Sequence, residues 1–146
     1  MDVYLEVGKK KTFAGALDWP GWSRSGRDEV RALDALLEAG SRYAKILHSS
    51  NLEFDLPQGI ERFNVVERLE GSAGTEFGVP AAVPAADLRT LQDKELERWQ
   101  ALLKTFGLAF IDTAKSVEGK ELRKGPRGGG RDLVKIMSHV LEANAG

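Results

Sequence analysis

The chain has 146 residues, of which 42% are hydrophobic and 29% are charged, and this composition fits one compact unit or two small ones that share a core. The 21 Lys and Arg residues nearly balance the 22 Asp and Glu residues, which excludes a uniformly cationic surface for binding nucleic acid or a membrane. The sequence contains no cysteine and two histidines, which excludes disulfides, thiolate zinc sites and cysteine nucleophiles and limits any histidine-based metal site.

The first segment of the chain alternates apolar and polar residues. Apolar side chains recur at every second position on both sides of a Gly-Lys-Lys turn, so residues 2–17 are predicted to form an antiparallel hairpin. A helix is predicted next, from a capping residue at Ser25 to His48, because apolar residues recur there at helical spacing.

Two further runs alternate in the same way. Residues 51–56 and 63–69 lie on either side of a Pro-Gln-Gly turn, which predicts a second hairpin. The predicted order over residues 1–70 is therefore β-β-α-β-β. We expect an α+β fold, because a helix laid on one face of a small antiparallel sheet buries the apolar faces of both.

The second half of the sequence has a different pattern. Residues 71–86 are rich in Ala, Gly and Pro and have no sustained periodicity, which predicts a linker or a surface crossing. Residues 87–146 predict a two-helix segment. Its long amphipathic helix starts between Thr90 and Asp93, and a short helix in the last 15 residues packs against it.

Residues 1 to about 48 resemble the HicB-type antitoxin domain. In that family a hairpin ends in an aspartate-x-proline-glycine turn, and a polar-glycine step opens a helix. The matching positions here are Asp18, Pro20, Gly21, Ser25 and Gly26. The resemblance implies a HicB-like α+β layer over residues 1–70 and a partner that is a small RNA-cleaving toxin. HicB-type proteins often carry a separate DNA-binding module, and no such module is legible in this sequence.

Residues 87–146 look like the first two helices of a DinB-like bundle. The similarity is carried by a leucine-rich helix, a loop, and a helix with the step Met137-Ser138-His139-Val140. That family binds a divalent metal through three histidines, so the resemblance implies that His139 is a metal ligand. The other two family histidines come later as a pair four residues apart, and this chain ends before such a pair. The remaining ligands would then come from missing sequence or a second chain.

Two tryptophans flank the Pro20-Gly21 step, and a cation follows them. Trp19, Trp22 and Arg24 are candidate ligand-binding residues, because paired indoles beside a guanidinium can form a cation-π stack or a flat platform for a ligand or peptide. The alternative is that each tryptophan covers one end of the sheet core.

A basic, glycine-rich loop lies directly before the last helix. Its candidate anion-binding residues are Arg127, Gly128, Gly129 and Arg131. Free backbone N–H groups at a helix start, close approach at glycine and flanking guanidinium groups favour an anion. Asp132 opposes this, because its carboxylate can cap the same helix start. The alternative is a solvated loop without a ligand.

These features together predict a small cytoplasmic binding or interaction module without enzymatic activity or cofactor. No apolar run reaches the ~20 residues of a membrane span, and the N-terminus lacks signal-peptide features. We expect a protein partner or a small anion, and neither a membrane nor a nucleic acid. We also expect a homodimer, because the apolar stripes of two helices exceed what those helices can cover. Two alternatives stay open: a fragment or relative of a DinB-like metal-dependent hydrolase or transferase, and an antitoxin-like regulator.

Overall fold

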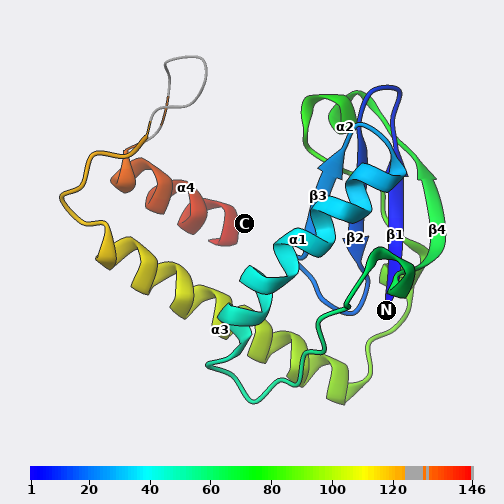
Figure 1. Cartoon of the computed structure of the whole chain (residues 1–146). Coiled ribbons are helices and arrows are strands. Elements are labelled where there is room, and N and C mark those ends of the chain that lie inside the picture. The colour runs from blue at the N-terminus through cyan, green and yellow to red at the C-terminus, as the bar shows by residue number, and fades with distance from the viewer. Residues whose placement is uncertain (124–129, 131, 146) are drawn as a thin grey trace. The chain divides into compact units, whose positions relative to one another are not determined.

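A computed structural model describes residues 1–123, 130 and 132–145. It confirms the predicted α+β class, with one four-stranded mixed sheet and several helices (Figure 1). The chain divides into two compact units, Met1–Ala101 and Leu102–Gly146. The first unit contains the whole sheet, and the second contains the greater part of the two C-terminal helices.

The sheet has the strand order β3-β2-β1-β4. Its strands are β1 (Asp2–Val7), β2 (Thr12–Ala16), β3 (Ser23–Gly26) and β4 (Asn64–Glu70). The predicted hairpin over residues 2–17 is confirmed, because β1 pairs antiparallel with β2, which in turn pairs antiparallel with β3. β4 lies on the other side of β1 and runs parallel to it, with a register shift between Val3 and Tyr4.

The predicted antiparallel β-β-α-β-β arrangement is wrong, since the observed order of strands and α1 is β-β-β-α-β and the last strand is parallel to β1. Ser25 does not cap the helix: it lies in β3, and α1 (Glu29–Leu47) begins after Asp28. Residues 51–56 lie outside the sheet, so the second hairpin is absent. Their alternation is real, but it reflects an extended segment that turns Phe54 and its apolar neighbours inward without a strand partner. β4 is parallel to β1 because the chain returns to the sheet through a helical crossover.

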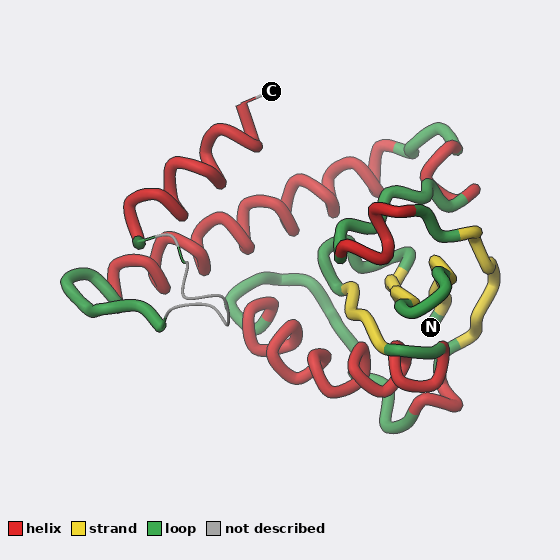
Figure 2. Tube along the Cα trace, turned by 90° about the horizontal axis from the view of Figure 1, so that it is seen from above, coloured by secondary structure: helices red, strands yellow, loops and turns green. Residues whose placement is uncertain are grey.

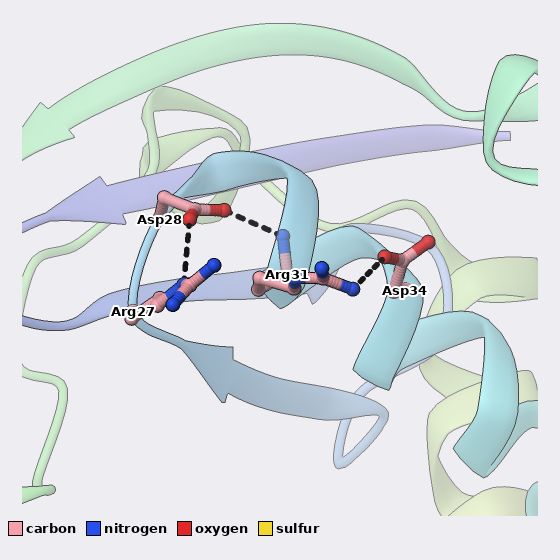
Figure 3. A network of polar contacts seen from close by, with 4 residues as sticks. All are labelled: Arg27, Asp28, Arg31 and Asp34. Carbon is pink, nitrogen blue, oxygen red and sulfur yellow. Dashed lines mark hydrogen bonds and ion pairs between the residues drawn. The ribbon is translucent and has the colours of Figure 1, made fainter.

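Four charged residues surround the start of α1 (Figure 3). Asp28 caps the helix, since its Oδ1 accepts a hydrogen bond of 2.8 Å from the backbone N–H of Arg31. Arg27 pairs with Asp28 at 3.3 Å, and Arg31 pairs with Asp34 at 3.5 Å. Each guanidinium group therefore has a carboxylate beside it, and these two arginines are not available as an unpaired cationic patch.

The apolar core lies between α1 and one face of the sheet. α1 buries residues at helical spacing, which are Ala32, Leu36, Gly40, Tyr43 and Leu47. The sheet contributes Val3, Leu5, Ala14 and Ala16. A bidentate ion pair between Arg68 of β4 and Glu29 of α1, with an Nη2–Oε2 distance of 3.0 Å, fastens the edge strand to the helix.

The opposite face of the sheet is covered by the segment predicted as a linker or surface crossing. Its short helical turns are α2 (Ala73–Phe77) and η2 (Ala85–Leu88), whereas η1 (Ile60–Arg62) precedes β4 and contacts α1. Glu6 of β1 is 1% exposed and accepts hydrogen bonds from the Thr75 hydroxyl and from the backbone N–H groups of Ala81 (3.0 Å) and Ala82 (2.9 Å). One buried carboxylate thus holds the segment against the sheet.

The two C-terminal helices are α3 (Asp93–Ser116) and α4 (Leu133–Ala145). α3 begins where the sequence predicts. Within the second unit, α4 runs beside the C-terminal part of α3 (Figure 2), and a hollow of about 630 Å³ lies between them. Leu102 and Ala114 are buried, whereas no described residue of α4 is. Among the described residues, no helix is both long and apolar enough to cross a bilayer.

Candidate functional site

The turn between β2 and β3 carries both tryptophans of the predicted platform. The backbone N–H of Trp22 donates to the Trp19 carbonyl at 3.1 Å, and Gly21 has a φ of 84°, in the left-handed region that favours glycine. The Tyr43 hydroxyl of α1 donates to the Pro20 carbonyl at 3.0 Å. Burial raises the pKa of Tyr43, so this hydroxyl keeps its proton and holds the turn against α1 at neutral pH.

Trp22 belongs to the core. It is 1% exposed, its Nε1–H donates to the Leu36 carbonyl at 2.8 Å, and its ring stacks on Tyr43 with centroids 5.6 Å apart. Phe54 and Phe63 meet its edges at 5.2 Å and 5.8 Å. The indole therefore has almost no surface for a ligand and matches the alternative in which a tryptophan covers the sheet core.

Trp19 lies at the margin of this aromatic cluster and is 8% exposed. The guanidinium carbon of Arg98 is 4.2 Å from its ring centroid, which is a cation-π contact. The cation at this indole is therefore Arg98 of α3. Arg24 instead directs Nη1 to the carbonyl of Ser23, at 2.7 Å. The sequence did not point to Arg98, since nothing local links α3 to the turn.

A hollow of about 580 Å³ opens beside Trp19, a volume within the usual range of ligand sites. Its apolar wall is formed by Trp19, Leu56 and Pro57. The segment that replaces the predicted third strand therefore supplies one side of the hollow, and the β2–β3 turn supplies the other.

Three carboxylates also line this hollow: Asp18, Glu53 and Asp55. None of them forms an ion pair within the part of the chain that the structure describes. Arg62 and the ammonium group of Met1, which donates to the Arg62 carbonyl at 2.9 Å, contribute two cations to the lining. Glu53 and Asp55 were not predicted as site residues. The pattern that could have identified them is their alternation with the inward apolar residues of the 51–56 segment.

The predicted anion-binding residues Arg127, Gly128, Gly129 and Arg131 lie outside the described residues. The helix start that follows them is described. Asp132 Oδ1 accepts a hydrogen bond of 2.8 Å from the backbone N–H of Lys135, as the capping expectation requires. This backbone hydrogen bond, with help from the Lys135 side chain, lowers the pKa of Asp132. The N–H group of Lys135 therefore already donates to a carboxylate of the chain and is not free to bind a separate anion.

His139 is exposed on α4. The described residues contain no cluster of three or more His, Cys, Asp or Glu side chains arranged to hold a metal ion. The assignment of His139 as a metal ligand stays a prediction, and its companions are not identified among these residues.

Comparison with known proteins assigns no relative to this chain: no family model matches the sequence, and no curated protein or solved structure is significantly similar.

Proposed function

We propose that this protein is a binding module that holds a basic segment of a partner protein in the hollow beside the β2–β3 turn. The observation that carries this proposal is the set of three carboxylates, Asp18, Glu53 and Asp55, around an aromatic and aliphatic wall, none of them paired with a cation in the described part of the chain. A lysine or arginine suits both features, because its charged end pairs with carboxylates while its methylene stem packs on apolar side chains.

The charges in the hollow predict a modest, salt-sensitive affinity. Ion pairs at exposed sites each contribute about 0.2–1 kcal/mol. Three carboxylates together then change the binding constant by roughly tenfold, which corresponds to ~1.4 kcal/mol. Since the Debye length falls to about 3 Å at 1 M salt, binding should weaken steeply as salt is added.

The test compares two variants that have equal net charge. One replaces the hollow's carboxylates, as Asp18→Asn, Glu53→Gln and Asp55→Asn. The matched control removes three exposed carboxylates that lie outside the lining, as Glu38→Gln, Glu70→Gln and Glu97→Gln. The probe is a labelled peptide of alternating arginine and serine, and the readouts are fluorescence anisotropy and the amide and indole NMR signals of Trp19.

We expect the hollow variant to bind the peptide about tenfold more weakly than the native chain and the control variant to bind within twofold of it. Shifts should centre on Trp19 and on residues 53–58. Equal loss in both variants, or shifts spread over the whole surface, would refute a site at the hollow and leave only general charge attraction.

An antitoxin-like role is the second candidate, supported by where the HicB-like residues lie. The turn formed by Asp18, Pro20 and Gly21 joins β2 to β3 and borders the hollow, and Gly26 ends β3 just before α1. In this case the basic segment belongs to a small toxin. Purification of the tagged chain from its native cell should then recover one small basic protein at equal stoichiometry, and the hollow variant should not recover it. If the native chain and the hollow variant both recover the small basic protein, the toxin does not bind at this hollow.

A further inference from the structure

An exposed face of α3, within the second unit, carries large apolar side chains. Leu103 is 70% exposed, Leu108 is 53% exposed, and Ile111, which also lines the hollow between α3 and α4, is 43% exposed. Lys104, Gly107 and Asp112 are also exposed. These six residues form two neighbouring ridges at a spacing of four, one of Leu103, Gly107 and Ile111 and the other of Lys104, Leu108 and Asp112.

Gly107 sits in the middle of the first ridge. A glycine inside a helix costs about 1 kcal/mol relative to alanine. Within the described part of the chain nothing requires the small residue, because a Cβ atom at Gly107 would meet no atom there within 4 Å. A glycine on an exposed helix face permits close approach by another backbone, which a side chain would prevent.

When the helix direction is reversed, the first ridge reads the same way and the second exchanges its cation for its anion. The first is apolar, glycine, apolar, and the second is cation, leucine, anion. In an antiparallel pair of identical helices, Leu103 meets Ile111 of the second copy, and Lys104 meets Asp112 of the second copy. A parallel pair would bring Lys104 against Lys104, and like charges at that position disfavour it.

We propose that α3 pairs antiparallel with α3 of a second copy of this chain, around a two-fold axis beside Gly107 and Leu108. Such an isologous contact covers the exposed Leu103, Leu108 and Ile111 and repeats each contact twice. It also gives partners to Lys104 and Asp112, which form no ion pair among the described residues. This inference does not depend on the proposed function, because the hollow beside the β2–β3 turn lies in the first unit.

Charge reversal tests the pairing directly. Lys104→Asp places two carboxylates opposite each other twice, and Asp112→Lys does the same with two cations. Each single variant should shift the native chain from twice the monomer mass to the monomer mass in sedimentation equilibrium. The double variant restores opposite charges and should restore the dimer. Circular dichroism should show unchanged helix content, which would exclude unfolding as the reason for dissociation of the dimer.

A cysteine placed at the axis gives a second readout, which is clean because the chain has no cysteine of its own. Leu108→Cys should form a disulfide-linked dimer under mild oxidation, whereas Thr113→Cys, exposed on the other side of α3, should not. A native chain that stays monomeric at millimolar concentration would overturn the proposal. So would single and double charge variants that behave alike, or equal cross-linking at positions 108 and 113.

Discussion

Gly40 lies in the middle of α1, where a glycine weakens the helix by about 1 kcal/mol relative to alanine. Close packing at this position explains why a glycine is present. A Cβ atom at this position would lie 2.9 Å from Cζ2 of Trp22 and closer still to Cδ1 of Leu56. The missing methyl group lets α1 pack directly against the indole and against the segment that lines the hollow.

Replacing Gly40 with alanine should therefore destabilise the protein, although alanine is the better helix former. Overpacking typically costs about 1–3 kcal/mol, and the gain in helix propensity returns ~1 kcal/mol of that. The free energy of unfolding, measured by urea denaturation and followed by tryptophan fluorescence, should fall. Ser41→Ala, an exposed position on the same helix, is the control and should change stability by less than about 0.5 kcal/mol. A more stable Gly40→Ala protein would contradict the close packing.

At the scale of elements, Glu6 couples β1 to the chain that follows β4. Its carboxylate is buried and accepts three hydrogen bonds, one from Thr75 and two from the backbone at Ala81 and Ala82. A buried acceptor of this kind stabilises the fold only while every donor it faces is satisfied. Two exposed hydrogen bonds also hold the segment over the second sheet face, from Lys10 N–H to Glu76 at 3.0 Å and from Ala85 N–H to Glu67 at 2.9 Å, whereas the carboxylate of Glu6 is buried.

Glu6→Gln should loosen that segment at Ala81 and Ala82. The amide group can satisfy fewer of the three donors, and we expect a loss of at least about 2 kcal/mol in unfolding free energy. Hydrogen exchange measured by NMR should show faster exchange at the amides of Ala81 and Ala82 before it changes in α1. Glu70→Gln, at an exposed position of β4, serves as the control. Unchanged protection at both amides would refute the role of Glu6.

A second element-scale contact fixes the start of α3. Arg89 Nη1 lies 2.9 Å from Glu95 Oε2, and the same oxygen accepts from the backbone N–H of Gln92 at 3.1 Å. The hydrogen bond from Arg89, followed by that from Gln92, lowers the pKa of Glu95. A carboxyl group with a lowered folded pKa contributes stability that is fully present above its ordinary value of 4.5 and is lost as the pH falls through the folded pKa.

The native chain and Glu95→Gln should thus differ in melting temperature at pH 6, and the difference should shrink as the pH falls below 4.5. Thermal unfolding at a series of pH values and constant ionic strength measures this difference in melting temperature. Glu97→Gln, two residues further along α3 and without an ion pair among the described residues, gives the baseline. A difference that stays constant down to pH 2 would show that Glu95 acts without its charge.

At the scale of the whole molecule, the sequence predicted where helices and strands form more accurately than it predicted which of them pair. Periodicity located the first hairpin, α1 and the start of α3, because each is a local pattern. It could not distinguish a strand from an extended segment at residues 51–56, since both turn alternate side chains inward. The candidate hollow depends on contacts such as Arg98 with Trp19 and on Glu53 beside Asp18, which are distant in sequence and leave no local signal.

The metal content of the purified chain separates the binding module from the DinB-like alternative. His139 is exposed, and its ring lacks the companions that a metal site requires among the described residues. We expect zinc, nickel and manganese to be substoichiometric in untagged protein analysed by mass spectrometry of its metals. One metal ion per chain that disappears in His139→Ala would reverse this conclusion and favour the enzyme.

The place of β1 in the sheet has a consequence for how the chain folds. β1 is flanked by β2, which follows after a short turn, and by β4, which begins only at Asn64. The hairpin and α1 can form from local contacts, whereas the parallel pairing needs closure of the long loop that contains α1. During synthesis on the ribosome, the open edge of β1 therefore stays a template for incorrect strand pairing until β4 emerges. We therefore expect the chain to be most prone to aggregation in the interval before β4 pairs with β1.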